Sequence, residues 1–390
     1  MRQRITNIFL EFTRSEKNAG LVLIFCTIIS LILANSAFSE EYIHFWHQHI
    51  SISIMDFELN YSIEHWINDG LMTIFFILVG LEIERELYAG ELHPIKNALL
   101  PIMAAVGGMI VPALIYSAIN FNYPTIKGFG IPMATDIAFS LAILSLVSNK
   151  VSSSVKVILT ALAIIDDLGS IFVIAFFYGQ DIQWFYLGTS LGIFLILLIM
   201  NRLKIYRLTP YALLFIPMWY CMMKSGIHAT LSGVLFAFAL PFNDREEKNP
   251  SVRLQELLHI PVGFLILPLF TLANTAIPIK TEYVSELLNV HSLGIGLGLY
   301  IGKPLGIFLG ILLLVKLKIV RLPEGVSWYK IISMGVVAGI GFTMSIFITH
   351  LAFDEEVLIQ SSKMMILITA VMSGITGYLM FLLSKNKLIE

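Results

Sequence analysis

Twelve apolar runs follow one another along this chain, and most are long enough to cross a bilayer as one helix. Such a helix needs about 20 residues. In lipid, every backbone polar group must be paired within the protein, so only helices and closed barrels span it. A barrel would show alternating segments of about ten residues instead. The sequence therefore predicts an all-α membrane protein with about twelve transmembrane helices, at residues 19–36, 66–83, 98–119, 130–147, 157–178, 184–200, 209–223, 226–241, 260–277, 291–315, 331–352 and 363–383.

The composition agrees with this fold class. The chain is 57% hydrophobic and 13% charged, whereas a soluble domain is about 25% charged. Polar stretches are too short for a separate soluble domain, so residues 1–390 are predicted to form one membrane domain. The net charge of −2 and the lack of a basic tail indicate no nucleic-acid partner. The GxGxxxG spacing at Gly296–Gly302 lies in a span before Pro304, which favours close helix packing over a nucleotide loop, and no cofactor is expected.

Lys and Arg residues are concentrated on one side of the predicted membrane. With the N-terminus in the cytoplasm, 20 of the 25 Lys and Arg residues lie in cytoplasmic segments and four lie outside. Lys303 is the remaining one and falls within a span. Cytoplasmic connections carry an excess of Lys and Arg. The sequence therefore predicts an even number of spans with both termini cytoplasmic.

The longest outer connection, about residues 37–65, contains the stretch HISISIMDFELNYSI. Apolar and polar residues alternate there on both sides of Met55-Asp56, which predicts a short β-hairpin. An isolated hairpin is marginally stable in water. We therefore expect it to pair with a second copy, giving a homodimer through residues 45–58; a flexible loop is the alternative.

Asp166 and Asp167 stand side by side in the run from Val157 to Tyr178, which carries no other charge. A charged side chain at bilayer depth costs about 2.5–3.5 kcal/mol even on the lenient insertion scale. Two adjacent carboxylates also repel each other. Ionisable residues tolerated at this depth mark ion or proton pathways, so we interpret the pair as an ion or proton site.

Two of the apolar runs are interrupted. In the fourth, GFGIPMATDIAFS, glycine and proline precede Thr135 and Asp136, and in the eleventh, VAGIGFTMSIF, Gly339 and Gly341 precede Thr343. Broken helices at membrane depth require protein or water to satisfy the freed backbone groups. Each run is the middle of a three-span block, 98–178 or 291–383, and the blocks start on opposite sides. This pattern predicts two inverted repeats with a transport site at the breaks, although two unrelated packing kinks are the alternative.

Lys303 lies near the middle of the tenth run, in LGLYIGKPLGIFLG. A buried lysine without a partner would lose its proton. We therefore expect it to pair with Asp166 or Asp167. Adjacent helical residues point about 100° apart, so one aspartate can face Lys303 while the other faces a water-filled cavity.

Charged residues also cluster where the second run ends, in GLEIEREL. They form either a solvated collar or a funnel that concentrates cations and responds to pH. His228 is expected to be a structural residue at a helix end, and His259 lies near Glu256 where a role in the pH response is possible. The cluster His44, His47 and His49 has the spacing of metal ligands, but Trp46 among them favours a membrane interface.

Six motifs occur in one order over nearly the whole chain: GLEIEREL, IPMATDIAF, ALAIIDDLG, KSGIHATLSG, GKPLGI and GIGFTMSIF. Together they resemble the NhaA family of bacterial sodium/proton antiporters. The resemblance implies twelve helices, of which the fourth and eleventh are unwound where they cross. It implies a transporter, not an enzyme, that exchanges cytoplasmic Na⁺ or Li⁺ for external protons. The exchange would be electrogenic, with two protons per Na⁺, would be regulated by pH, and would serve sodium and pH homeostasis in a bacterial inner membrane.

The resemblance also implies roles for individual residues. Asp167 would be the main carboxylate that binds the cation and exchanges protons, and Asp166 would pair with Lys303, so that the transported Na⁺ is expected at the two aspartates. Thr135 and Asp136 would belong to the crossed segments, with Asp136 offsetting helix-end dipoles. The second proton would come from Asp166 or from Lys303. Glu82, Arg85 and Glu86 would sit in the funnel associated with the pH response. Glu256 and His259, from their position at the start of the ninth run, are added as candidates for the same response.

The chain departs from the family pattern at two places. Gln255-Glu256 stand where the type member has a Glu-His pair, although His259 is kept, and Glu84 replaces a lysine in the GLExKREL motif. These departures predict a shifted or weaker pH response with an intact transport site.

Two other functions compete with antiport. An intramembrane aspartyl protease needs two aspartates facing one water molecule, but its GxGD signature is absent and Lys303 would disrupt the pair. A transporter of an organic anion or another solute would fit the broken helices. The doubled aspartate favours a bare cation instead.

Overall fold

The computed structural model describes residues 2–54, 57–90, 95–179, 181–242, 249–323 and 325–384, with side chains described from residue 18 onward except at 52–58 and 95–97. The described chain is mostly helical, with one two-stranded sheet. All twelve apolar runs are helical over most of their length, which confirms the predicted fold class.

The described residues contain seven helices that are long and apolar enough to cross a membrane, and up to ten candidates when each bent helix pair counts as one span. The seventh and eighth predicted spans fall outside this set. They correspond to α9 (Leu208–Lys224), which contains Pro217, and α10 (Thr230–Ala239). Ten helical residues extend only about 15 Å, roughly half a hydrocarbon core. The count of twelve therefore stays a prediction.

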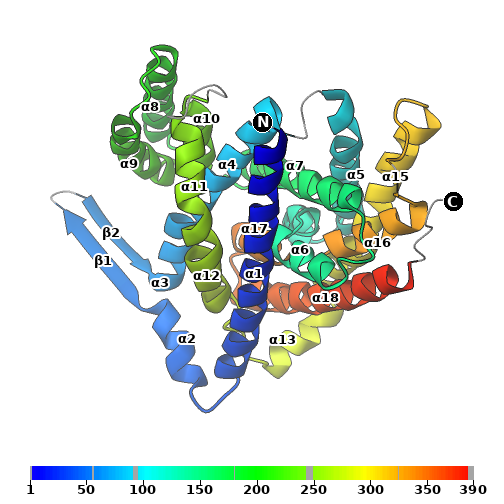
Figure 1. The fold of residues 1–390 in the computed structure, drawn as a ribbon. Helices are drawn as coiled ribbons and strands as arrows, with labels where there is room; N and C mark the ends of the chain where they lie inside the picture. The colour runs from blue at the N-terminus through cyan, green and yellow to red at the C-terminus, as the bar shows by residue number, and fades with distance from the viewer. Residues whose placement is uncertain are drawn as a thin grey trace. The chain divides into compact units, whose positions relative to one another are not determined.

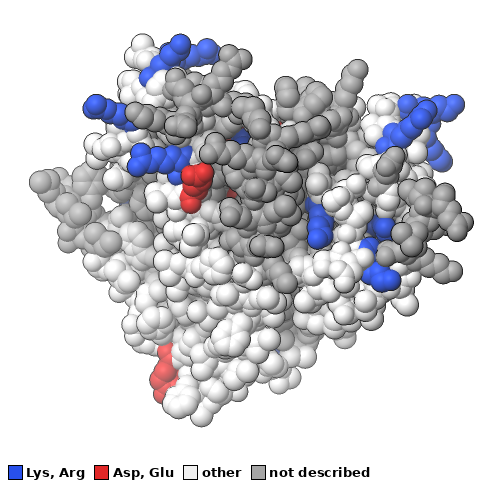
Figure 2. Space-filling view, viewed as in Figure 1, with Lys and Arg blue, Asp and Glu red and all other residues white. Residues whose placement is uncertain are grey.

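The chain divides into two compact units. The first comprises residues 1–25, 91–170 and 279–390, and the second comprises residues 26–90 and 171–278. Almost all of both predicted repeats, 98–178 and 291–383, falls in the first unit. Their inverted relation, and a single domain over residues 1–390, stay predictions. In each unit, Lys and Arg gather near helix ends, as at α8 (Trp184–Arg202) and α15 (Lys303–Lys316), beside broad uncharged surfaces (Figure 2).

The first unit is built around a close contact between α5 (Ile95–Ile119) and α15 (Figure 1). The two helices touch backbone to backbone, because a Cβ atom at Gly107 would overlap the Gly306 carbonyl and a Cβ at Gly306 would overlap the Gly107 carbonyl. Small residues permit this approach between membrane helices. The GxGxxxG segment continues the contact, since Gly302 lies against Pro112. Helix packing therefore explains these glycines, as predicted.

The second unit packs α4 (Met72–Ala89) against α10. A Cβ atom at Gly80 would lie 2.6 Å from Ala237 Cβ, so this contact is also close. Its apolar core includes Ile77 and Leu81 of α4, Phe236 of α10 and Leu197 of α8. The unit also contains α11 (Pro250–Pro261) and α12 (Leu267–Asn274), joined by the π-helix η3 (Val262–Ile266).

The predicted β-hairpin is present in the second unit (Figure 1). Strands β1 (His49–Ile54) and β2 (Phe57–Ser62) pair antiparallel in the register His49↔Ser62 to Ile54↔Phe57. The range 45–58 given for it was wrong. Residues 45–47 belong to the helix α2 (Ser39–His47), and the second strand continues to Ser62. Met55 and Asp56, between the two strands in the sequence, lie outside the described residues.

The contact between α5 and α15 predicts a difference between two glycine substitutions. Gly306→Ala forces the helices apart, and overpacking of this kind costs about 1–3 kcal/mol. Gly192→Ala is the matched control, because a Cβ atom at Gly192 in α8 meets nothing within 4 Å and alanine favours a helix over glycine. We expect the unfolding temperature of the purified protein to fall for Gly306→Ala and to stay equal or rise for Gly192→Ala. An equal effect of both would contradict the close contact.

Candidate ion-binding site

Two broken helices meet inside the first unit. The 3₁₀-helix η2 (Pro124–Met133) and α6 (Ile137–Leu146) are bent by 45° at their junction, and α16 (Trp328–Ala338) and α17 (Phe342–Ala352) are bent by 49°. The backbone N–H of Asp136, at the first break, donates to the carbonyl of Ile340 at the second, 2.7 Å away. The two predicted breaks are therefore confirmed, and they are joined to each other.

Asp136 lies at the amino-terminal ends of both α6 and α17. Its Oδ1 accepts from the Phe139 N–H at 3.0 Å, and its Oδ2 accepts from the Thr343 N–H at 3.0 Å. The first N–H groups of a helix have no partner within that helix and carry partial positive charge. One buried carboxylate therefore caps two helices, which fits the role of offsetting helix-end dipoles.

The carboxyl-terminal ends at the two breaks have donors instead. Thr135 Oγ1 donates to the Ala338 carbonyl at the end of α16, 3.0 Å away, and Lys303 Nζ donates to the Met133 carbonyl at the end of η2. Helix carboxyl ends favour hydroxyl and ammonium donors because their carbonyls are unpaired and partly negative. The polar groups at the breaks thus match the charge of the helix ends that they contact.

Lys303 and Asp166 form a buried ion pair. Lys303 Nζ lies 2.6 Å from Asp166 Oδ2, and both side chains are 0% exposed. Thr135 Oγ1 also lies 2.8 Å from the same Asp166 oxygen, so its single hydroxyl hydrogen can be donated either to Asp166 Oδ2 or to the Ala338 carbonyl. Asp166 Oδ1 has no hydrogen-bond partner among the described residues. The geometry selects Asp166 rather than Asp167 as the partner of Lys303.

Asp167 lies next to this pair on α7 (Ser153–Phe177). Asp167 is only 2% exposed. In this conformation it therefore does not face water, contrary to the expectation from the sequence. Within the described residues, no three His, Cys, Asp or Glu side chains gather in a way that would hold a metal ion. A cation bound at the aspartate pair would therefore also need hydroxyl or carbonyl ligands.

The charged end of α4 is buried rather than solvated. Glu82, Glu84 and Glu86 are 7%, 4% and 8% exposed, so the solvated collar is wrong for these three residues. Arg85 lies 3.2 Å from Glu86 Oε1, and Ser251 of α11 donates to Glu84 Oε2 at 2.7 Å. Sequence reasoning missed Ser251, because no motif marks it.

Glu256 and His259 both lie on α11, which packs against α4. Glu256 is exposed and His259 is half-buried, whereas Gln255 is buried. Burial alternates in this way because the residues point to different faces of one helix. Gln255, one of the two residues at which the chain departs from the family pattern here, lies on the buried face of α11, and Glu256 lies on the exposed face.

Three of the other histidines have structural contacts. His228 lies two residues before α10, and its Nε2 lies 3.0 Å from the Tyr178 carbonyl, which agrees with a residue at a helix end. His49 contacts Asn60 across the hairpin, 3.1 Å from Nδ1 to Oδ1, and His47 Nδ1 lies 3.7 Å from Glu64 Oε2.

Comparison with known proteins gives consistent matches over the chain. Residues 10–381 match the model of the family described as Na⁺/H⁺ antiporter 1. The chain is 54% identical to a Na(+)/H(+) antiporter NhaA of Flavobacterium psychrophilum over 389 residues, 99% of each chain. It is 52% identical to a Na(+)/H(+) antiporter NhaA 1 of Flavobacterium johnsoniae, over 98% of this chain and 99% of that one. It is 46% identical to a Na(+)/H(+) antiporter NhaA 1 of Clostridium beijerinckii, over 99% and 98% respectively.

The buried ion pair predicts a specific pattern of stability. Lys303→Met leaves Asp166 as a buried charge without its cation, a loss that typically costs about 3–5 kcal/mol, whereas a neutral pair can be tolerated. We expect Lys303→Met to lower the unfolding temperature, and the double variant Lys303→Met/Asp166→Asn to recover part of the loss. Unfolding followed by tryptophan fluorescence measures the effect. A double variant that loses as much as the two single variants together would contradict the coupling.

Proposed function

We propose that this chain, which belongs to the Na⁺/H⁺ antiporter 1 family, exchanges cytoplasmic Na⁺ for external protons across a membrane. The family match confirms the resemblance predicted from the six motifs, and with it a multi-pass membrane transporter rather than an enzyme. The intramembrane protease is thereby excluded. The observation that most supports exchange at the predicted site is the Lys303–Asp166 ion pair beside Asp167, where two broken helices meet.

The exchange rests on competition for the same oxygen atoms. A cation needs deprotonated carboxylate ligands, so cation and protons exclude each other. Asp167 binds Na⁺ as it loses a proton to the cytoplasm, and external protons displace Na⁺ when the site opens outward. Asp166 adds a second carboxylate when its pair with Lys303 opens. Thr135 and Asp136 hold the crossed segments in place around the site.

The finer properties follow from the resemblance. Two protons exchange for each Na⁺, so the membrane potential contributes to Na⁺ extrusion; the second proton comes from Asp166 or Lys303. Li⁺ replaces Na⁺ as a substrate. The protein lies in a bacterial inner membrane with both termini cytoplasmic, as the distribution of Lys and Arg favours, and it serves sodium and pH homeostasis.

The pH response is proposed to lie at the contact between α4 and α11. Glu82, Arg85 and Glu86 lie at the end of α4, and Glu256 and His259 lie on α11, the helix that packs against it. The Glu84–Ser251 hydrogen bond fixes the two helices together in this chain.

A pH-gradient assay in everted membrane vesicles, from cells lacking other antiporters, tests the proposed function. Adding Na⁺ or Li⁺ should collapse the gradient and K⁺ should not, and the response should disappear at low pH because protonated carboxylates do not hold a cation. Asp167→Asn should abolish the response, because it removes the main ligand. No Na⁺ response between about pH 6.5 and 9 would refute antiport, and a normal rate in Asp167→Asn would refute the role of this residue.

The homodimer is proposed to form through the hairpin, now bounded as residues 49–62. A two-stranded sheet is marginally stable alone and leaves unpaired strand edges, which a second copy would cover. Replacing residues 49–62 by a short glycine-serine linker should halve the mass of the protein in detergent, as measured by light scattering. An unchanged mass would exclude the hairpin as the dimer contact.

A further inference from the structure

Ser170 follows the two aspartates by about one turn on α7. With about 100° per residue, Ser170 projects about 40° from Asp166 and about 60° from Asp167 around the helix axis. Residues three or four apart on a helix are neighbours, with Cβ atoms about 5–6 Å apart. The serine hydroxyl therefore lies between the directions of the two carboxylates, on the same face of the helix.

The hydroxyl of Ser170 is buried without a hydrogen bond. The residue is 1% exposed, and its Oγ has no hydrogen-bond partner among the described residues. Among the other buried helical serines of the same unit, Ser333 and Ser361 donate to the backbone one turn earlier, whereas Ser362 and Ser373 of α18 (Glu356–Leu383) are also without a described partner. A buried polar group left unpaired costs about 1–3 kcal/mol, a cost that a bound ion or water molecule would remove. Ser170 differs from Ser362 and Ser373 in lying one turn from the two aspartates.

Its neighbours indicate what this ligand is. Asp166 Oδ1 also has no described hydrogen-bond partner, so oxygen atoms from two successive turns are available on one face of α7. Hard cations take oxygen ligands from carboxylates, hydroxyls, carbonyls and water. The described residues provide no further carboxylate cluster here, so a small cation at Asp167 needs neutral oxygen ligands nearby.

We propose that Ser170 Oγ is a ligand of the transported cation, which it binds together with Asp167, and that it contributes to selection between Na⁺ and Li⁺. This inference rests on the proposed antiport function and adds a residue to it. The hydroxyl supplies a neutral oxygen that needs no deprotonation, so it does not change how many protons compete with the cation. Removing it weakens cation binding while leaving the carboxylate chemistry in place.

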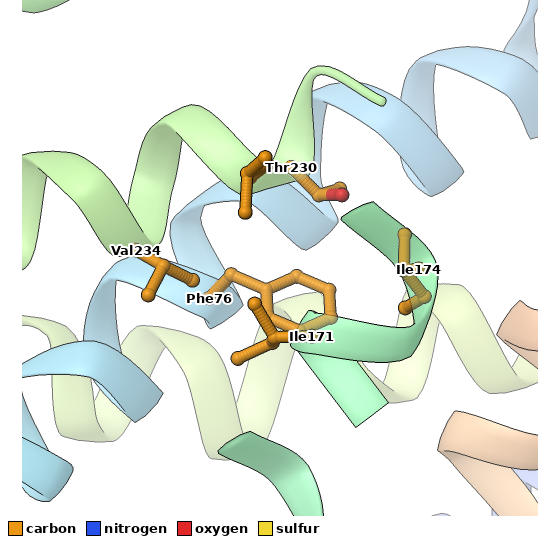
Figure 3. Close-up of a pocket in the computed structure, with 6 residues that line it drawn as sticks. Phe76, Ile171, Ile174, Thr230 and Val234 are labelled. Carbon is orange, nitrogen blue, oxygen red and sulfur yellow. The ribbon is translucent and has the colours of Figure 1, made fainter. Parts of the chain in front are cut away.

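The sequence of α7 after Ser170 is consistent with this role. The next side chains on the helix are apolar as far as Phe177. Ile171 and Ile174 point into an apolar pocket of the second unit that Phe76, Thr230 and Val234 also line (Figure 3). Ser170 is therefore the only residue of α7 after the two aspartates whose side chain contains an oxygen atom.

Thr160 provides a matched control on the same helix. Its Oγ1 is likewise buried without a described partner, and it precedes Asp167 by seven residues, which brings it to nearly the same face. Seven residues separate the two by about 10.5 Å along the axis, too far to share one cation. Thr160→Val removes this hydroxyl without changing the size of the side chain.

The test compares Ser170→Ala, Ser170→Cys and Thr160→Val with the unmodified protein. We expect Ser170→Ala to raise the half-saturating Na⁺ concentration about fivefold to tenfold, with a changed Na⁺/Li⁺ ratio and a retained maximal rate. Ser170→Cys should behave similarly, because sulfur is a poor ligand for a hard cation. Thr160→Val should leave all three quantities unchanged. The same ranking should hold for the rise in unfolding temperature on adding NaCl in place of choline chloride, a measure of binding without transport.

The outcomes separate the two proposals. An unmodified protein without a Na⁺ response refutes the antiport function itself. A responding protein whose Ser170→Ala variant keeps the same Na⁺ concentration dependence and thermal shift refutes only the role of Ser170. If Ser170→Cys keeps normal Na⁺ binding, Ser170 acts through packing and is not a ligand. If Thr160→Val raises the half-saturating Na⁺ concentration as much as Ser170→Ala does, the ligand role of Ser170 is also refuted. Where Ser170→Ala does not give a monodisperse protein, Ser170→Cys decides the question.

Discussion

The need to satisfy four helix ends inside a membrane protein governs the structure of the site. Two helices are broken where they meet in the first unit, and each break exposes backbone donors on one side and acceptors on the other. Water satisfies such groups in a soluble protein, whereas here Asp136 accepts from both amino-terminal ends and Thr135 and Lys303 donate to the carboxyl-terminal ones. The polar residues at the breaks therefore stabilise the broken helices, because they pair the backbone groups that the breaks leave unsatisfied.

Close helix packing between α5 and α15 positions Lys303. Lys303 starts α15, the helix that meets α5 backbone to backbone at Gly107 and Gly306. A Cβ atom at Gly108, beside this contact, would lie 3.7 Å from Lys303 Cε. The lysine side chain therefore passes beside Gly108, and a side chain larger than a methyl group there would reach it. Gly108 on α5 thus keeps the space next to the Lys303 side chain open.

Much of the site was predictable because charge and helix-breaking residues are costly in apolar runs and therefore conspicuous. Asp166, Asp167 and Lys303 were found in this way, and the 100° between adjacent residues required that only one aspartate face the lysine. The partner carbonyls were not predictable, because Met133 contributes only its backbone. Ser251 was missed for a related reason: a serine at the start of a helix is common, and its contact with Glu84 depends on how α11 packs on α4. The alternating stretch at residues 49–63 located both strands to within one residue, whereas the range 45–58 given for the dimer contact began inside α2 and ended before the second strand does.

The hydrogen bonds of the ion pair also indicate how it can be stable and still open. Asp166 Oδ2 accepts from Lys303 and can also accept the hydroxyl hydrogen of Thr135, whose other acceptor is the Ala338 carbonyl. Lys303 donates both to Asp166 and to the Met133 carbonyl. When the two charges separate, each therefore retains one hydrogen bond. A buried charge left with no partner is the main cost of breaking such a pair, and these second partners reduce that cost on both sides. The same contacts that satisfy the broken helices would thus make the opening of the pair, which the proposed exchange requires, less costly.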